Sequence, residues 1–495
     1  MVQLCSRAGP RGLPWMGRVV LGKTRKVHFV GVGGIGMSGI AELLANLGYA
    51  VSGSDEKRSA VTDRLASLGI GVTLGHEATA VGDSDVVVVS SAVPAANPEV
   101  IEAIRRQIPV IPRAEMLAEL MRLRFSIAVA GAHGKTTTTS MVAFMLERAG
   151  LDPTAVVGGR VRAFGSNARL GRGNLMVAEA DESDRSFLKL FPSIAVVTNI
   201  DHEHLENYGG FDDLLQAFVD FANHVPFYGG VVACADDANL ARIIPRMTRR
   251  VTTYGLKGQG CDVTATDIRL NPLGVEAVIT RRGRRAGGTE AVPAPLGSLR
   301  LQVPGRHNLQ NALAAVTVGL ELDVPFDRIA SALHEFRGVE RRFDIRGEAD
   351  GILVVDDYGH HPTEIAAVLE AARGLNRRLI VAFQPHRFTR TAALMDAFGP
   401  ALVEADHIVL ADIYGAGEEP LAGITVDALA SAIRRSVRAT VDVAPSLDEV
   451  LTTVLRASRP GDVVMTLGAG SISTVPERLI DALNERAGRA TGGVA

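Results

Sequence analysis

A glycine-rich segment, GAHGKTTTTS at residues 131–140, limits the folds that this chain can adopt. It follows the apolar run FSIAVA and precedes a helical pattern that ends at Gly150, so it joins a strand to a helix. Backbone N–H groups at such a helix start bind phosphate, and the helix dipole favours an anion there. Val129 stands where a standard phosphate-binding loop has its first glycine. The context of strand, loop and helix still predicts a nucleoside-triphosphate site on a parallel sheet.

Individual residues of this loop have distinct expected roles. Gly131 and Gly134 allow the backbone to approach phosphate, and Lys135 brings a positive charge toward the outer phosphates. Thr136 offers a hydroxyl group to Mg²⁺.

Two further apolar runs end in polar residues that belong to the same predicted site. Glu179 ends LMVAE, and His204 follows SIAVVTNIDHE. Ligands of open parallel sheets bind beyond the carboxyl ends of the strands, so Lys135, Glu179 and His204 are expected to converge. Carboxylate and imidazole ligands predict a metal site for Mg²⁺ or Mn²⁺.

A second glycine motif, GVGGIG, lies about a hundred residues earlier. Gly31, Gly33 and Gly36 follow a strand pattern and open a helix, and Asp55 ends the next strand. This spacing is typical of a Rossmann loop that binds a diphosphate, with Asp55 accepting from a ribose or a base. NAD and a nucleotide-sugar fit the motif equally well.

Polar residues also follow strand patterns in the last third of the chain. Arg387 and Arg390 are three residues apart at a helix start, and guanidinium groups suit carboxylate recognition. Asp357, Tyr358, His360 and His361 follow the apolar run ILVV and are expected to face the same site.

Length and composition bound the remaining possibilities. The 495 residues suggest about three domains, which we place at 23–124, 125–338 and 339–487, between a leader at 1–22 and a frayed tail at 488–495. All three blocks alternate strands with helices, so the predicted class is α/β, with Rossmann-like outer domains and a central P-loop-type parallel sheet. A net charge of −3 gives no reason to expect a nucleic-acid partner, and no run of 18 apolar residues predicts a membrane span. Three scattered cysteines favour the reducing cytosol.

From about residue 25 to residue 485 the chain resembles the Mur ligases of peptidoglycan synthesis. The resemblance rests on segments in family order: GVGGIGMSGIA, SSAVPAANPE, RAEML, GAHGKTTTT, EADESDRSFL, VTNIDHEHLENY, PGRHNLQNALAA, DDYGHHPTEI and FQPHRFTRT. EADESDRSFL and the last two segments are similar to the alanine-adding branch. The family's own loop is shorter than a standard phosphate-binding loop, which accounts for Val129.

The resemblance implies an activity and its substrates. An N-terminal domain would bind the UDP end of UDP-N-acetylmuramate, a central domain would bind ATP as co-substrate, and a C-terminal domain would close over both. L-alanine would be joined to the lactyl carboxylate through an acyl phosphate, with Mg²⁺ or Mn²⁺ bound. A homodimer is left open. The nearest alternative is a recycling ligase that joins a murein tripeptide; folate-glutamate ligation, an NAD-dependent oxidoreductase and a non-catalytic UDP-sugar-binding regulator are more remote.

The resemblance also implies residue roles. ATP would contact Gly131, Ala132, His133, Gly134, Lys135, Thr136, Thr137, Asn308, Asn311, Arg341 or Arg342, and Asp357. The UDP-sugar would contact Gly31, Gly33, Gly34, Ile35, Gly36, Asp55 and Ser90. Tyr358, His360, Arg387 and Arg390 would orient the muramyl carboxylate and alanine, while Lys135, Glu179, His204 and Arg342 would be catalytic, with Thr136, Glu179 and His204 holding the metal. Ala132 departs from the family's usual threonine. The carbamylated lysine of sister ligases has no counterpart, because no lysine lies between Lys189 and Lys257.

Overall fold

The computed structural model describes residues 21–90, 92–162, 164–257, 260–284 and 290–491. The chain divides into two compact units, with the boundary between Arg124 and Phe125. Residues 1–20 of the predicted leader lie outside the described residues.

The first unit is a five-stranded parallel sheet in the order β3-β2-β1-β4-β5. Its strands are β1 (Lys26–Val30), β2 (Ala50–Asp55), β3 (Gly71–Leu74), β4 (Val86–Val89) and β5 (Val110–Pro112). Its α-helices are α1 (Ile35–Asn46), α2 (Ala60–Ser67), α3 (Pro98–Arg105) and α4 (Arg113–Met121). The central strand β1 is buried from its second residue onward, as expected for a parallel strand covered on both faces. The strand order is the Rossmann order without its sixth strand, as the GVGGIG motif predicts.

A buried polar network that the sequence did not reveal lies within this unit. The carboxylate of Glu99 is fully buried and lies 2.6 Å from His28 Nε2 and 2.7 Å from His76 Nδ1. Ser54 Oγ donates to the same carboxylate over 2.9 Å. Burial alone would raise the pKa of Glu99, but these hydrogen bonds lower it, so the side chain is a satisfied carboxylate.

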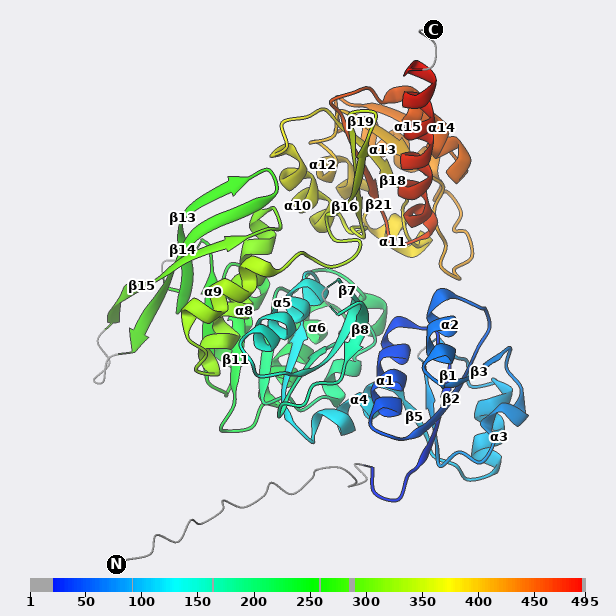
Figure 1. The fold of residues 1–495 in the computed structure, drawn as a ribbon, viewed down its shortest axis with the longest axis vertical. Helices are drawn as coiled ribbons and strands as arrows, with labels where there is room; N and C mark the ends of the chain where they lie inside the picture. Colours follow the sequence, from blue (N-terminus) through cyan, green and yellow to red (C-terminus); the bar gives the residue numbers. More distant parts are fainter. Residues whose placement is uncertain (1–20, 91, 163, 258–259, 285–289, 492–495) are drawn as a thin grey trace, which may run out of the picture. The chain divides into compact units, whose positions relative to one another are not determined.

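The second unit begins with a ten-stranded sheet in the order β15-β14-β13-β12-β11-β10-β6-β9-β7-β8. Its parallel part contains β6 (Phe125–Ala130), β7 (Thr154–Val161), β9 (Leu175–Glu179), β10 (Ile194–Val197), β11 (Gly230–Cys234) and β12 (Val251–Gly255). At one edge an antiparallel pair adds β8 (Ser166–Arg169). At the other edge β13 (Val263–Asn271) pairs in parallel with β12, and antiparallel pairs then add β14 (Gly274–Arg284) and β15 (Glu290–Leu301). The last three form the long antiparallel extension in Figure 1.

Helices connect and cover this sheet. They are α5 (Lys135–Arg148), α6 (Phe211–Asn223), α7 (Ala238–Ile243), α8 (Arg306–Glu321) and α9 (Phe326–Glu335). Helices α5, α8 and α9 pack against one another, and α5 is buried along most of its length, which explains its lack of a polar face (Figure 1).

A second sheet of this unit has the order β16-β17-β21-β18-β19-β20. Its strands are β16 (Asp344–Ala349), β17 (Ile352–Asp357), β18 (Leu379–Phe383), β19 (His407–Leu410), β20 (Thr440–Val443) and β21 (Val463–Leu467), and only β16 is antiparallel to its neighbour. Its helices are α10 (Pro362–Arg373), α11 (Phe388–Ala393), α12 (Phe398–Ala401), α13 (Val426–Arg434), α14 (Leu447–Ala457) and α15 (Val475–Thr491).

Side-chain alternation along β18 shows why this sheet carries helices on both faces. Leu379, Val381 and Phe383 enter one apolar core, whereas Ile380 and Ala382 enter another. A strand with period-two alternation that is apolar on both sides needs cover on both sides. The predicted α/β class with parallel sheets is confirmed.

One boundary of the sequence prediction was wrong. The last helix was expected to end near Arg486 with a frayed tail from 488, but α15 continues to Thr491. Residues 492–495 of the predicted tail lie outside the described residues. No helix in the described part of the chain has the length and apolarity needed to cross a membrane.

The Glu99 network gives a prediction about stability. Glu99→Ala leaves His28 and Ser54 buried without their acceptor, so we expect a loss of roughly 3–5 kcal/mol in the free energy of unfolding of the first unit. The measurement is the shift of the urea transition followed by far-UV circular dichroism. Glu102→Ala removes a partly exposed carboxylate of the same helix and serves as the control, with a much smaller shift. Equal shifts for the two variants would contradict this reading of the network.

Candidate functional site

The loop between β6 and α5 has the backbone shape that its glycines allow. Gly131 has φ +137° and Gly134 has φ +77°, a region that favours glycine. A Cβ atom on Gly131 would overlap Thr198 Oγ1, and one on Gly134 would lie 2.6 Å from Asn311 Oδ1. Val129, the position without the expected glycine, is a fully buried residue of β6 paired with its neighbours in the sheet. The loop therefore starts two residues later than in a standard phosphate-binding loop.

Lys135 begins α5 and is held by groups of its own loop and by a buried acid. Its Nζ donates to the carbonyl oxygens of Gly131 at 2.6 Å and Ala132 at 3.1 Å, and lies 2.7 Å from Glu182 Oε1. Burial would lower the pKa of Lys135, but the charges of Glu182 and Asp181 outweigh burial and raise it. The ammonium group is therefore charged and sits at the start of a helix, where phosphates bind.

Thr136, in the first turn of α5, and Glu179, at the end of β9, are brought together. Thr136 Oγ1 donates to Glu179 Oε1 over 3.2 Å, and the other carboxylate oxygen accepts from the backbone N–H of Gly158 over 2.8 Å. A Cβ atom on Gly158 would overlap the Glu179 carboxylate, so this approach requires glycine. A hydroxyl and a carboxylate in contact fit two oxygen ligands of one Mg²⁺ ion.

His204 lies in the segment after β10 and adopts a left-handed backbone with φ +57°. Burial lowers its pKa, and the charge of Lys135 lowers it further. The charge of Glu179 raises the pKa of Lys135, so Lys135 lies within electrostatic reach of both Glu179 and His204. A partly buried imidazole with a lowered pKa suits the role of metal ligand that the sequence predicts.

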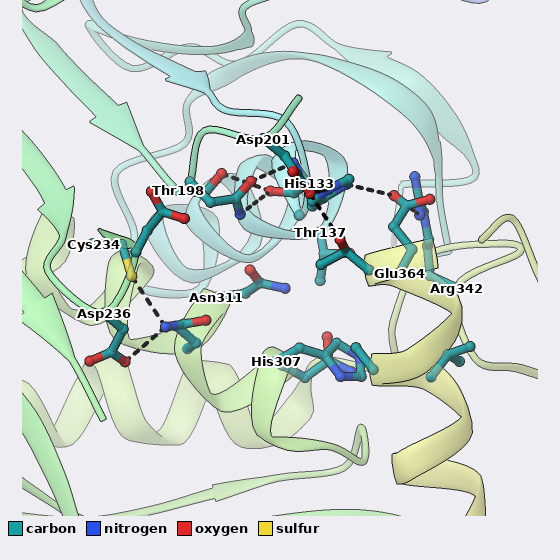
Figure 2. Close-up of a pocket in the computed structure, with 18 of the residues that line it drawn as sticks. His133, Thr137, Thr198, Asp201, Cys234, Asp236, His307, Asn311, Arg342 and Glu364 are labelled. Atoms are coloured by element: carbon teal, nitrogen blue, oxygen red, sulfur yellow. Dashed lines mark hydrogen bonds and ion pairs between the residues drawn. The ribbon is translucent and has the colours of Figure 1, made fainter. Parts of the chain in front are cut away.

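The segments after β6 and β10 line a cavity of about 420 Å³ in the second unit, although Lys135, Thr136, Glu179 and His204 are not among its lining residues. Figure 2 shows Cys234 and Asp236 at one end of it and Arg342 and Glu364 at the other, with Asn311 between them. Of the predicted ATP residues, seven line this cavity: His133, Gly134, Thr137, Asn308, Asn311, Arg342 and Asp357. Residues from both sheets of the unit therefore form one binding space of a size suited to a small-molecule ligand.

The sequence reasoning missed several polar residues of the cavity. They are Asn199, Asp201, Asp236, Asp237, Asn239, Lys257, His307, Gln310, Thr363 and Glu364. Gln310 Nε2 donates to Asp236 Oδ2 over 2.8 Å and contacts Cys234 Sγ at 3.2 Å. These contacts fix the end of the cavity where Figure 2 shows Cys234 and Asp236. Position after a strand end was the available signal for Asp236 and Asp237, because both follow β11 directly.

Asn308 and Asn311 are both buried, but each already has a partner on the protein. Asn308 Nδ2 donates to the carbonyl oxygen of Pro304 over 2.7 Å, and Asn311 Oδ1 accepts from Thr138 Oγ1 over 3.2 Å. Asn311 therefore joins α8 to α5 as well as facing the cavity.

The structure separates the two adjacent arginines that the sequence could not distinguish. Arg342 lines the cavity, lies 3.4 Å from Glu364 Oε1 and stacks over the Tyr358 ring. Arg341 is not among the described residues that line the cavity. Its guanidinium is held by Asp356 at 3.1 Å and by the carbonyl oxygen of Gly468. Arg342 is therefore the arginine placed to face a phosphate, and Arg341 supports the second sheet.

Asp357 ends β17 with its carboxylate buried at the cavity. It accepts from the backbone N–H groups of Phe343 at 2.6 Å and Gly359 at 2.7 Å. Burial raises the pKa of Asp357 to about 6, against the opposing charge of Arg342. At neutral pH the carboxylate is charged and can accept from a hydroxyl group.

Arg390 and His360 belong to a further polar cluster, together with His386, which was missed. Arg390 contacts His386 Nδ1 at 3.2 Å and lies 3.7 Å from Glu203 Oε1. The His360 and His386 rings are 5.5 Å apart, and burial lowers the pKa of each to about 4. A guanidinium beside two neutral imidazoles can hydrogen-bond a carboxylate.

Arg387 lies at the start of α11 but is more exposed than Arg390. Its guanidinium is 3.8 Å from Glu206 and 3.9 Å from Glu418, and its φ is +69°. The two arginines thus face different carboxylates: Arg390 faces Glu203, and Arg387 lies between Glu206 and Glu418.

The glycine motif of the first unit forms a loop closed by its own acid. Gly33 N donates to Asp55 Oδ2 over 2.8 Å, and Gly31 has φ +80° with Ser90 beside it. A Cβ on Gly36 would lie 2.7 Å from Arg113, so close helix packing requires this glycine. Gly34 is the N-cap of α1, and its N–H donates to the carbonyl oxygen of Gly31 over 3.3 Å. The Ile35 side chain lies outside the described residues.

Three family models match consecutive parts of the chain. Residues 26–125 match the Mur ligase family catalytic domain, residues 129–319 the Mur ligase middle domain, and residues 341–470 the Mur ligase glutamate ligase domain. These matches confirm the predicted three-domain α/β architecture.

Curated relatives and solved structures agree with these models. A UDP-N-acetylmuramate–L-alanine ligase of Geotalea daltonii is 52% identical over 94% of this chain and 99% of the relative. The protein of the same name from Geobacter sulfurreducens is 53% identical over 94% and 99%. A crystal structure of UDP-N-acetylmuramate–alanine ligase from Thermotoga maritima is 29% identical, covers 93% of this chain and 99% of that one, and has a TM-score of 0.77. The chain is a member of the Mur ligase family.

Proposed function

We propose that this protein is an ATP-dependent ligase that joins L-alanine to the lactyl carboxylate of UDP-N-acetylmuramate and forms ADP and phosphate. The observation that carries the proposal is identity of 52–53% over nearly the whole length of both chains with relatives of that name. A murein peptide ligase structure is 24% identical, a likeness that extends to the fold alone. We expect the reaction in the cytoplasm, in the synthesis of peptidoglycan precursors.

The cavity supports ATP as the first reactant. Its phosphates would lie on the loop of Gly131 to Lys135, its ribose at Asp357, and its base toward the end that holds Asp236 and Gln310. Thr136, Glu179 and His204 would hold Mg²⁺, which supplies positive charge to the phosphates when bound.

The first chemical step forms an acyl phosphate. The lactyl carboxylate oxygen attacks the γ-phosphorus in line, and the bond to the bridging β,γ-oxygen breaks to release ADP. Lys135 is charged at the start of α5, and Arg342 faces the cavity, so both are placed to stabilise the transferring group.

The second step forms the amide. The alanine amine attacks the acyl carbon, and the bond to the phosphate oxygen breaks. His360 Nδ1 lies 3.0 Å from the carbonyl oxygen of Tyr358, an acceptor that keeps hydrogen on Nδ1 and leaves Nε2 as the basic nitrogen. Glu364 lies 3.6 Å from Nδ1 and would stabilise the imidazolium that forms. His360 is therefore the base that accepts the proton lost by the alanine amine, because His204 is proposed as a metal ligand.

Phosphate release by the purified protein tests the proposed function. With ATP, Mg²⁺ and UDP-N-acetylmuramate, release should be fastest with L-alanine, compared with glycine, L-serine, D-glutamate and the murein tripeptide, because the family branch adds alanine. Omission of the UDP-sugar should abolish it. Preference for the tripeptide would move the protein to the recycling reaction, and no release with any acceptor would refute ligation.

Removal of the Lys135 charge should affect the chemical step. We expect Lys135→Ala to lower kcat by roughly 10²–10³-fold, the usual cost of losing one group that stabilises a transition state. Lys189→Ala is the matched control, because Lys189 is an exposed lysine of the same domain, and its kcat should remain near that of the wild type. An unchanged kcat in Lys135→Ala would contradict the assigned role.

The pKa of Asp357 predicts how ATP affinity depends on pH. Because burial raises this pKa to about 6, the carboxylate becomes protonated as the pH falls below 6 and no longer accepts from the ribose. The KM for ATP should therefore rise as the pH falls through 6, while Asp357→Asn should have a raised KM at neutral pH without this rise. A wild-type KM for ATP that stays constant from pH 7.5 to pH 5 would exclude the contact between Asp357 and the ribose.

A further inference from the structure

The glycine-rich loop of the first unit is held by the end of a neighbouring strand. We call residues 31–34 the GVGG loop. The carbonyl oxygen of Ser54 accepts from its first two backbone N–H groups, those of Gly31 and Val32, each over 2.9 Å. The carboxylate of Asp55 accepts from the third N–H group of the loop over 2.8 Å. The last two residues of β2 therefore fix the first three N–H groups of the GVGG loop.

Little space separates this strand end from the GVGG loop. A Cβ atom on Gly53 would lie 2.7 Å from the Cβ atom of Val32, which is itself fully buried. A Cβ atom on Gly33 would lie 2.8 Å from Asp55 Oδ2. Both close approaches require glycine. A shift of the end of β2 is therefore passed on to the loop, because close-packed interiors transmit strain.

The side chain of Ser54 is fixed from another direction by the Glu99 network. Its Oγ donates to Glu99 Oε2 over 2.9 Å, and both residues are fully buried. Glu99 lies in the first turn of α3, and its backbone N–H donates to Asn97 Oδ1 over 2.9 Å. Because a helix start favours a negative charge, the Glu99 carboxylate has both a fixed position and a favourable place for its charge.

The other contacts of the Glu99 carboxylate are also with the protein. His28 Nε2 lies 2.6 Å from Oε2, and His76 Nδ1 lies 2.7 Å from Oε1. These are hydrogen-bond lengths, which leave no room for a metal ion or a substrate group between the atoms. Any effect of Glu99 on the reaction must therefore pass through a residue that it holds.

A buried carboxylate is a costly way to stabilise a fold. Its removal from water must be offset by the three side chains that donate to it, whereas apolar side chains would fill the same space without that cost. A fully satisfied polar network does, however, fix one geometry. Here it fixes Ser54 near the end of β2, and the GVGG loop is attached to that end.

We propose that Glu99 is a positioning residue for nucleotide-sugar binding: by holding Ser54, it keeps the GVGG loop in the shape that binds the diphosphate of UDP-N-acetylmuramate. This role rests on the proposed function, in which the first unit binds the UDP end of that substrate. Lys135 and the proposed Mg²⁺ ligands belong to the second unit. Loss of the contact between Glu99 and Ser54 should therefore weaken binding of the UDP-sugar and leave the chemical steps unchanged.

Binding and turnover of two serine variants of the full chain test this role. Calorimetry without ATP or alanine gives the Kd for UDP-N-acetylmuramate, and phosphate release gives KM and kcat. Ser54→Ala should raise the Kd and the KM for the UDP-sugar roughly 10-fold, the effect of losing one hydrogen bond to a charged group. Its kcat and its KM for ATP should stay within about twofold of the wild type, because only uniform binding is lost.

Ser52→Ala is the matched control. It removes a hydroxyl group of the same strand that contacts the same network, through His28 Nδ1 at 2.8 Å, but that lies two residues before the carbonyl group that holds the loop. Its Kd for the UDP-sugar should equal that of the wild type.

A double-mutant cycle shows whether Glu99 acts through Ser54. Glu99→Gln keeps the size of the side chain and removes its charge, and it should also raise the Kd for the UDP-sugar by roughly 10-fold. The double variant should bind about as weakly as one single variant, rather than roughly 100-fold more weakly than the wild type. Multiplied effects would mean that the two residues act independently, which would overturn the role of Glu99.

Three other results would also overturn it. They are a Kd that is unchanged in both Ser54→Ala and Glu99→Gln, an equal loss of affinity in Ser52→Ala, and a lower kcat in Ser54→Ala without a change in Kd. Circular dichroism identifies a variant that fails to fold, in which case the Kd of the remaining variant decides. If the wild type binds the UDP-sugar and releases phosphate, the proposed function stands whatever the variants show. No binding by the wild type would refute both.

Discussion

The parallel pairing of β6 with β9 and β10 is the constraint on which the site depends. In this register Val129 lies opposite Glu179, and Ala130 lies opposite Val197. The phosphate-binding loop, the Glu179 carboxylate and the segment that leads to His204 therefore begin at the same edge of the sheet. A slip of one residue in β9 would turn Glu179 to the other face and separate it from Thr136.

The buried pair of Lys135 and Glu182 sets the electrostatic state of that edge. Lys135 holds its charge because carboxylates surround it, although burial opposes this. The same burial raises the pKa of Glu182 to about 7 in spite of the adjacent ammonium. Phosphate oxygens arriving at the loop would compete with Glu182 for Lys135. The lysine is thus kept charged and in place by a partner that a more strongly charged ligand can replace.

Residues placed by strand ends and glycine geometry could be predicted from the sequence, whereas those placed by loop conformation could not. Lys135 and Glu179 were found because each lies at a strand end next to a recognisable turn. Arg341 and Arg342 could not be distinguished, because their directions depend on the positive φ of Arg341 and of Phe343, which periodicity does not reveal. Gln310 was missed for a related reason: it acquires its role from Asp236, a residue more than 70 positions away.

Contacts between the two sheets of the second unit explain how binding and chemistry can be linked. The cavity is lined by His133 and Asn311 from the part of the unit around the ten-stranded sheet and by Arg342 and Asp357 from the part around the six-stranded sheet. A nucleotide that fills the cavity therefore contacts both parts. A ligand stabilises whichever arrangement of the sheets it binds more tightly. When both sides of the cavity contact the nucleotide, water also has less access to the site, where it would hydrolyse an acyl phosphate. Filling the cavity with ATP therefore favours the arrangement in which the acyl phosphate can survive until the amine attacks.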